Sequence, residues 1–369
     1  MAMADKTGRR TGSRWGWFAC AGALLFPVAR AEHASHQESA LTAFLSLEHI
    51  QRDVAADAGL SRVQTEPTAD IILGLRRQRL RLLGEFVVSR DEHEFERLQL
   101  GYEANTELTL WLGRFHQPAS GWNTLHHHGA YLQTSITRPW IEAWEDEHGV
   151  VPQHVTGVLG EWQHSLTSGR GLRISAGYGS APTLRDGRLD PFDQFGRRRL
   201  ASSAHASVRL EWLPDAAGET SIGLVASHAE LVVRRTDQRF GTGLEHGLYG
   251  VFYNLARARS RAIGALYVME LGGRGAAALG TQRHLASYLQ YEFEASPRVS
   301  LYARHEQITG VRRSAYLGEF PEVTPRCLLV GSRLQVGRRN ALSAELARRA
   351  MAGPGTYTEL RLQWSAAVP

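Results

Sequence analysis

The sequence alternates apolar and polar residues, with a period of two, in segments that recur from about residue 70 to its end. Residues 289–294 read Leu-Gln-Tyr-Glu-Phe-Glu, and residues 208–212 and 360–364 follow the same pattern. Successive side chains of a β-strand point to opposite faces, so each segment would carry one apolar and one polar face. The alternation therefore predicts an all-β fold.

The same pattern predicts roughly 16 or 17 strands, and we favour 16 because a bacterial single-chain barrel has an even number. The predicted strands cover residues 41–49, 69–76, 79–89, 94–104, 106–115, 153–166, 170–180, 200–213, 219–227, 228–236, 244–256, 260–271, 281–294, 298–309, 325–337, 339–350 and 356–365. Long connections are predicted at 50–68, 116–152, 181–199, 272–280 and 310–324, with short turns elsewhere. Short turns on one rim and long loops on the other are typical of an outer-membrane barrel.

Two all-β architectures fit this pattern: a transmembrane antiparallel barrel and a secreted β-sandwich. Strands of 9–13 residues are longer than the five or six usual in soluble sheets. The apolar faces of successive segments are rich in Leu, Val, Tyr and Trp, which suits contact with lipid. After the first 31 residues no apolar stretch reaches 18 residues, so a helical membrane protein is not expected. We therefore expect a barrel with an apolar outside and a polar lumen.

The N-terminus has the features of a signal peptide. Arg9, Arg10 and Arg14 form a basic region, residues 15–28 are apolar, and Ala29-Arg30-Ala31 fits a cleavage site, so the mature chain is expected to start at Glu32. Residues 1–31 hold five basic residues and one acidic residue, so their removal lowers the net charge from +5 to about +1. The basic character is therefore no argument for nucleic-acid binding, and none is expected.

The mature chain is expected to be a single domain. We predict a short flexible N-terminus at 32–40 and one barrel at 41–365. Cys327 is the only cysteine that remains, so closure of the barrel rather than a disulfide must provide stability.

Residues 114–157 break the alternation with a stretch rich in Pro, Trp and His, and seven of the 16 histidines lie between His116 and His164. Connections of this length in compact domains are usually functional. The stretch resembles one in a group of largely uncharacterised porin-like outer-membrane barrel proteins. The resemblance covers about 45 residues and depends on Gly113-Arg114-Phe115, Pro118, Trp122-Asn123, His127-His128-Gly129, Arg138-Pro139, Glu145-Asp146-Glu147 and Pro152-Gln153-His154. It implies a porin-type fold and an outer-membrane location, but no particular substrate.

This long loop follows the fifth predicted strand and precedes the sixth. If the N-terminus is periplasmic, the loop starts at the external rim, where the constricting loop of 16-strand porins also lies. We therefore predict that residues 116–152 fold inward and set the pore size. The candidate constriction residues are Arg114, His116, Trp122, His127, His128, Arg138, Glu142 and Asp146.

The histidines of this loop allow three interpretations. Neutral imidazoles can bind Zn or Cu, and His126, His127, His128 and His154 are the candidate ligands. Adjacent histidines in an extended segment point in alternate directions, which disfavours a site made by all three neighbours. They could instead pack the loop by hydrogen bonding to the acidic run at 142–147, or they could titrate near neutral pH and make the constriction pH-sensitive. The loop tryptophans 122, 140 and 144 allow two interpretations: they could form the core of the loop, or they could form a surface on which sugars stack.

The polar strand faces carry arginines that are expected to face the lumen. They are Arg81, Arg173, Arg209, Arg304, Arg333 and Arg361. Rings of arginine in a pore favour anions, but glutamates on the same faces leave only a weak preference for them.

The sequence therefore predicts an outer-membrane porin, a passive channel for small hydrophilic solutes, embedded in the lipid bilayer of a Gram-negative bacterium. Many porins are trimers, so a homotrimer is compatible with the resemblance. The alternative function is a metal-binding or metal-responsive outer-membrane protein that uses the histidine loop. A barrel-embedded hydrolase is a weaker third alternative, because no Ser-His-Asp arrangement stands out, and no enzymatic activity is expected.

Overall fold

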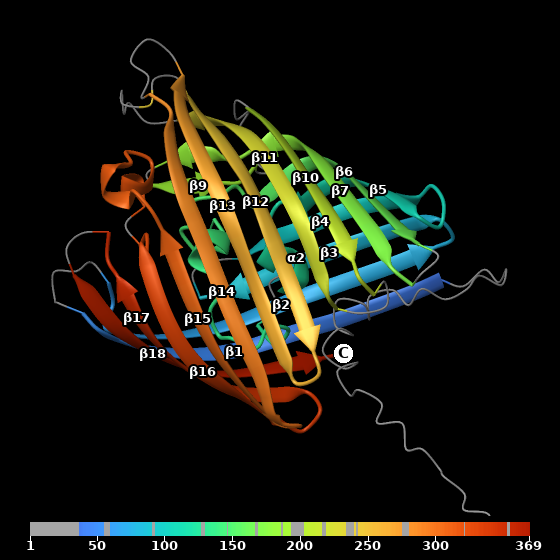
Figure 1. The fold of residues 1–369 in the computed structure, drawn as a ribbon. Helices are drawn as coiled ribbons and strands as arrows, with labels where there is room; N and C mark the ends of the chain where they lie inside the picture. Colours follow the sequence, from blue (N-terminus) through green and yellow to red (C-terminus); the bar gives the residue numbers. More distant parts are fainter. Residues whose placement is uncertain are drawn as a thin grey trace, which may run out of the picture.

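The computed structural model shows an antiparallel sheet of 16 long strands that closes into a barrel (Figure 1). The structure describes residues 37–54, 60–90, 93–126, 130–145, 147–166, 169–185, 187–192, 203–215, 219–233, 240, 243–274, 280–320, 322–352 and 355–369. The predicted signal peptide lies outside these residues. The predicted all-β barrel of 16 strands is confirmed.

The barrel strands pair in chain order, and the last strand pairs with the first. They are β1 (Gln37–Asp53), β2 (Val63–Arg77), β3 (Leu80–Ser89), β4 (His93–Glu103), β5 (Leu108–His116), β6 (His154–Ser165), β7 (Gly171–Ala181), β10 (Ser203–Leu213), β11 (Ser221–Val233), β12 (Gly243–Arg257), β13 (Ser260–Arg274), β14 (Gln282–Ser296), β15 (Val299–Ile308), β16 (Arg326–Val336), β17 (Asn340–Ala350) and β18 (Thr356–Val368). Closure places Ala43 opposite Val368 and Asp53 opposite Thr358.

A short hairpin interrupts the order between β7 and β10. It consists of β8 (Thr183–Arg185) and β9 (Arg188–Asp190), and β8 pairs with the end of β11 in parallel. β7 itself pairs with β10, so the hairpin is an addition to the barrel rather than part of its wall.

The observed strands are longer than the predicted ones at several ends. The predicted strands 219–227 and 228–236 are one strand, β11, which continues through His228 to Val233. β2 begins at Val63 within a predicted connection, and β1 begins at Gln37 within the predicted flexible segment. Most outward positions of these extensions are polar, among them Ser39, Thr65 and His228, so the apolar stripe that revealed the strands stops before the backbone pairing does.

The two rims of the barrel differ in the length of their connections. Residues 78–79, 258–259 and 297–298 are tight turns on the rim that holds the start of β1 and the end of β18. The opposite rim carries the long connections, including residues 117–153 after β5 and residues 309–325 after β15. The long loop thus follows the fifth strand and starts at the long-loop rim, as its position in the sequence predicts.

The outer face of the barrel is apolar, and aromatic side chains gather toward the short-turn rim. Each of them is more than a third exposed: Tyr102, Trp212, Tyr291, Phe293 and Trp364. An apolar band edged by aromatic residues is the surface that transmembrane barrels present to lipid. Among the described residues, no helix is long and apolar enough to cross a membrane.

The interior holds the long loop, with its helix α2 (Gly121–His126) and its 3-10 turn η2 (Trp140–Glu142). Figure 1 shows α2 inside the ring of strands. A buried apolar cluster joins Trp122 and Val150 of the loop to the inward-facing side chains of β11 to β14, such as Phe252 and Met269. The loop is therefore packed against one wall rather than suspended in the lumen.

Candidate functional site

The loop 117–153 is attached to the wall formed by β10 to β17, which we call the docking wall. Trp122 of the loop is fully buried against this wall. Its ring lies edge-on to Tyr288 of β14, with 5.9 Å between ring centroids, and the guanidinium of Arg304 lies over its face at 5.6 Å. Glycines make room for aromatic rings on this wall: a Cβ at Gly223 would collide with the ring of Phe252, against which Gly121 of the loop packs.

Glu142 is the main polar anchor of the loop. Its carboxylate accepts hydrogen bonds from the hydroxyls of Ser120, Tyr267 and Tyr288 and lies within 3.5 Å of the backbone nitrogen of Trp122. Its backbone carbonyl accepts a 2.8 Å hydrogen bond from Asn123 Nδ2. Burial raises the pKa of the Glu142 carboxyl above its usual range, although the hydrogen bonds from Ser120 and Tyr267 oppose the shift.

Two wall arginines bind backbone carbonyls of the loop. Arg304 Nη1 donates to the carbonyl of Thr137 at 2.7 Å, and Nη2 donates to the carbonyl of Arg138 at 3.0 Å. Arg333 donates to the carbonyls of Tyr131 and Gln133, each at 2.8 Å. A guanidinium offers five donors in a fixed plane, so one side chain can hold several loop carbonyls at once.

Two wall glutamates accept hydrogen bonds from backbone N–H groups of the loop. Glu345 of β17 receives those of Ile136 and Thr137, at 3.2 and 3.3 Å. Glu306 of β15 receives that of Trp140 at 2.6 Å. The loop backbone has few partners of its own, and buried peptide groups must be satisfied, so these wall side chains take the place of a sheet.

Other connections of the long-loop rim cover the docked loop. The segment 309–325 contains the 3-10 turns η4 (Val311–Arg313) and η5 (Leu317–Glu319), and Tyr316 between them donates to the carbonyl of Val150 at 2.6 Å. The β8–β9 hairpin adds Leu184 and Leu189, both buried in the same cluster. The loop is thus fixed from the wall side and from the rim side.

The root of the loop is a compact polar group. His116 ends β5, His154 begins β6, and the two are opposite each other in the strand register. His154 Nδ1 lies 2.7 Å from a carboxylate oxygen of Glu145, which also accepts the backbone N–H of Gln153 at 2.6 Å. Burial would raise the pKa of Glu145, but the charge and hydrogen bonds of His154 outweigh it and hold this pKa below its usual range.

The wall formed by β1 to β5 and β18, which we call the open wall, has a different character. Its inward face includes the buried pair Arg97–Glu85, but four of its arginines remain 10–30% exposed, each paired with a wall glutamate. The pairs are Arg52–Glu359, Arg76–Glu103, Arg81–Glu103 and Arg361–Glu48. Charged side chains that keep contact with water line an aqueous space, so the remaining lumen runs along this wall.

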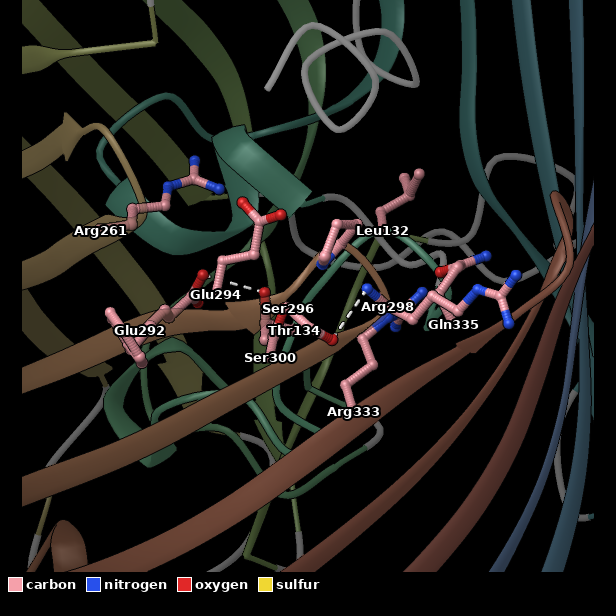
Figure 2. A pocket seen from close by; sticks show the side chains of 12 residues that line it. Leu132, Thr134, Arg261, Glu292, Glu294, Ser296, Arg298, Ser300, Arg333 and Gln335 are labelled. Atoms are coloured by element: carbon pink, nitrogen blue, oxygen red, sulfur yellow. Dashed lines mark hydrogen bonds between the residues drawn. The ribbon is translucent and has the colours of Figure 1, made fainter. Parts of the chain in front are cut away.

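A hollow at the short-turn end lies between the loop and β14 to β16 (Figure 2). Arg261, Arg298 and Arg333 border it together with Glu292 and Glu294. Thr134 of the loop donates a 2.9 Å hydrogen bond to Glu292 here (Figure 2). Both signs of charge are therefore present where the loop meets this end of the lumen.

The structure places the predicted constriction residues that it describes in two regions, the docked part of the loop and the root of the loop. Trp122 and Glu142 are 0% and 1% exposed and hold the loop in place, and Arg138 packs over the ring of Trp144. Arg114 and His116 are buried at the loop root. His127, His128 and Asp146 lie outside the described residues.

The predicted lumen arginines also divide. Arg209, Arg304 and Arg333 are at most 2% exposed and contact the loop, whereas Arg81, Arg173 and Arg361 are 17–38% exposed. The alternation of the strands carried no signal for what the polar face contacts. The wall acceptors Glu306 and Glu345 were missed as loop partners for the same reason.

The predicted metal ligands are not brought together within the described residues. His126 packs against Trp122 with its ring tilted and 4.7 Å between ring centroids, while His154 contacts Glu96 and Glu145. The bond to Glu145 is the contact that the loop-packing interpretation predicts. Trp122, Trp140 and Trp144 are all buried, so they form a loop core rather than an exposed stacking surface.

Comparison with solved structures identifies the architecture. The anion-selective porin from Comamonas acidovorans matches with a TM-score of 0.60 at 12% identity, over 90% of this chain and 100% of that one. OmpT of Vibrio cholerae, an outer-membrane protein, matches at 0.59 and 10% identity over 92% and 100%.

The chain has the porin fold.

The outer-membrane channel DcaP of Acinetobacter baumannii also shares the porin fold, at a TM-score of 0.55 and 9% identity, over 90% and 97% of the two chains. No protein-family model and no curated protein sequence matches the chain. These neighbours are outer-membrane proteins of Gram-negative bacteria. At this level of identity the likeness concerns the fold alone, and the interior must be interpreted from its own residues.

Proposed function

We propose that this porin-fold chain is an outer-membrane channel through which small hydrophilic solutes diffuse passively. The observation that carries the proposal is the asymmetric filling of the barrel. The loop 117–153 is fixed to the docking wall, while four arginines of the open wall keep contact with water in their ion pairs. A narrowed aqueous passage bounded by charged side chains selects solutes by size and polarity and needs no energy source.

The passage is proposed to prefer anions weakly. Arg76, Arg81 and Arg361 are exposed to it, but each is paired with a glutamate, which offsets most of its charge. A comparable anion-selective channel exists among the structural neighbours, the porin from Comamonas acidovorans. We expect a small reversal potential of the anionic sign in a salt gradient, smaller at high ionic strength because of screening.

Single-channel recording tests the channel itself. Refolded protein from residue 32 onward, placed in a planar bilayer, should give ohmic conductance steps. Replacing residues 120–148 by a short Gly-Ser linker should enlarge the steps, because the loop then no longer fills the lumen. The matched control is Arg283→Ala, which removes a 72% exposed arginine from the outer face of β14. Silence of the intact protein contradicts the channel, and unchanged steps after deletion contradict the constriction.

Location and assembly are part of the proposal. We propose export with cleavage after Ala31, insertion into the outer membrane and assembly into a homotrimer, an assembly that OmpT of Vibrio cholerae shows in its in-vitro folded form. Mass spectrometry of the purified chain should give a mature protein beginning at Glu32. Native mass measurement in detergent should give three chains per particle, and a monomer contradicts the trimer.

A further inference from the structure

Glu96, His116, His154 and Glu145 meet where the long loop leaves β5 and returns to β6. The rings of His116 and His154 are 5.0 Å apart between centroids, and Trp144 of the loop packs on both. Glu96 comes from β4, at the irregularity that shifts its register with β3. Four segments of the chain are thus held together by side chains at one point.

Three of these side chains lie close enough together to bind one metal ion. Glu96, His116 and His154 each place one nitrogen or oxygen atom within 4.8 Å of the other two. Ligand atoms around a tetrahedral zinc ion lie about 3.4 Å apart, given metal–ligand bonds of about 2.1 Å. Glu96 and His154 Nε2, 2.5 Å apart, would have to separate by about 0.9 Å to reach that spacing. Two imidazoles and one carboxylate suit Zn²⁺ and similar transition ions better than Ca²⁺ or Mg²⁺.

The surrounding contacts are those that orient metal-binding histidines. His154 Nε2 is 2.5 Å from Glu96, and its other nitrogen, Nδ1, is 2.7 Å from Glu145. A carboxylate on the far nitrogen fixes the ring and increases its basicity as a ligand. Glu145 is itself held by the backbone N–H groups of Gln153 and His154. The orientation of this ligand is therefore set by the fold.

Burial and charge favour a cation at this point. The side chains of His116, His154 and Glu96 are 7%, 2% and 1% exposed. Glu96 and Glu145 bring two carboxylates into a buried volume, where protonated His154 between them supplies a compensating charge that a divalent ion could supply in place of the proton. Glu85, 4.0 Å from His116 Nε2, is already paired with Arg97.

We propose that Glu96, His116 and His154 bind one divalent transition-metal ion of the Zn²⁺ type, which joins both ends of the loop to β4. The ion replaces the proton on His154 Nε2, which leaves to solvent, while the contact of Nδ1 with Glu145 is kept. A water molecule completes the fourth position, as in zinc sites with three protein ligands. His126 contacts Trp122 instead and is not part of the site.

Isothermal calorimetry of the refolded mature chain with ZnCl₂ tests the proposal without any channel recording. Alanine replaces residues 126–128 in the background so that the consecutive histidines add no binding. We expect one Zn²⁺ per chain, with affinity lowered at least about tenfold in His116→Gln and in Glu96→Gln. His164→Ala, which removes a 41% exposed histidine at the other end of β6, should bind as the background does.

Metal content and thermal unfolding give a second measurement. The dialysed background protein should retain zinc and unfold at a higher temperature than after chelation, and His116→Gln should show no such shift. Heat-modifiable mobility in gel electrophoresis establishes that each variant has folded. If the folded background binds no zinc, or if His116→Gln and Glu96→Gln both bind as it does, the site is wrong. Loss of zinc only on replacing residues 126–128 also overturns it and assigns the metal to the consecutive histidines.

Discussion

The docking wall and the open wall belong to one sheet with one alternation, yet their inward-facing side chains differ in burial and in what they contact. On the docking wall the inward positions are aromatic, aliphatic or fully buried charged residues, such as Phe252, Tyr267 and Arg304. On the open wall they include partly exposed ion pairs, such as Arg361 with Glu48, beside a smaller buried cluster that contains Ile72 and Trp111. The period of two determines which side chains point inward. Whether an inward-facing charge binds loop backbone or stays in water depends on whether the long loop packs against that part of the wall.

The largest effect is expected on the docking wall from Trp122→Ala. Removing a fully buried indole costs about 3–5 kcal/mol through lost contacts and the cavity left behind. This loss weakens loop docking, so larger and noisier conductance steps are expected in planar bilayers. The matched control is Trp212→Ala, which removes a 40% exposed indole from the outer face. If both variants conduct alike, the buried cluster does not hold the loop.

A smaller effect on the same wall is expected from Arg304→Gln. The change leaves the carbonyls of Thr137 and Arg138 without their charged donor, and hydrogen bonds to charged groups are worth about 1.5–3 kcal/mol. Limited proteolysis should then cut the loop faster than in the unchanged protein. Arg173→Gln, at a 38% exposed arginine, is the control and should leave the cleavage rate unchanged. Equal protection in both variants would show that Arg304 is dispensable for docking.

Trp122 and Arg304 show which features of the fold and of the site can be predicted from the sequence. Alternation located the strands, and counting them put the long loop after the fifth strand, at the correct rim. Arg304 was predicted to be a lumen arginine, whereas in the structure it is buried and its guanidinium binds carbonyls of the loop. Its partners are backbone carbonyls some 166 residues away in the chain, and no local pattern records such a contact.

Strand ends were the least predictable part of the fold, for a related reason. β11 continues past His228 because the backbone of β12 pairs with it, Ala229 lying opposite His246. The side chains there are no longer in the apolar band, so the stripe ends while the hydrogen bonds continue. The apolar stripe records contact with lipid, whereas strand length is set by backbone pairing.

On the open wall, Arg361→Gln should alter selectivity more than stability. A unit charge acts on an ion at 4 Å with about 1 kcal/mol in water, which corresponds to at most about a fivefold change in local ion ratio at low salt. The reversal potential should move toward the cation side, and the shift should shrink as salt is raised. Arg304→Gln, whose arginine is buried, provides the comparison and should shift the reversal potential less. The reverse order would place the passage along the docking wall.

The smallest effect expected is a pH dependence of docking through Glu142. Its pKa is raised above the ordinary value of 4.5 in the folded protein, chiefly by burial, so the docked loop favours the protonated carboxyl. This contribution to docking is fully present below the ordinary pKa and is lost as the pH rises through the folded-state pKa.

Tyr267, Tyr288 and Ser120 donate to this carboxylate, and Arg209 donates to the carbonyl of Ser120 at 3.4 Å. The three hydroxyl donors favour the ionised carboxylate, but burial outweighs them, so proteolysis of the loop should be slower at pH 5 than at pH 8, after correction for protease activity on an unfolded substrate. Glu142→Gln keeps the shape of the side chain but cannot ionise, so its cleavage rate should be nearly independent of pH. A pH response that survives in Glu142→Gln would assign the effect to another group and leave the carboxylate as a purely geometric anchor.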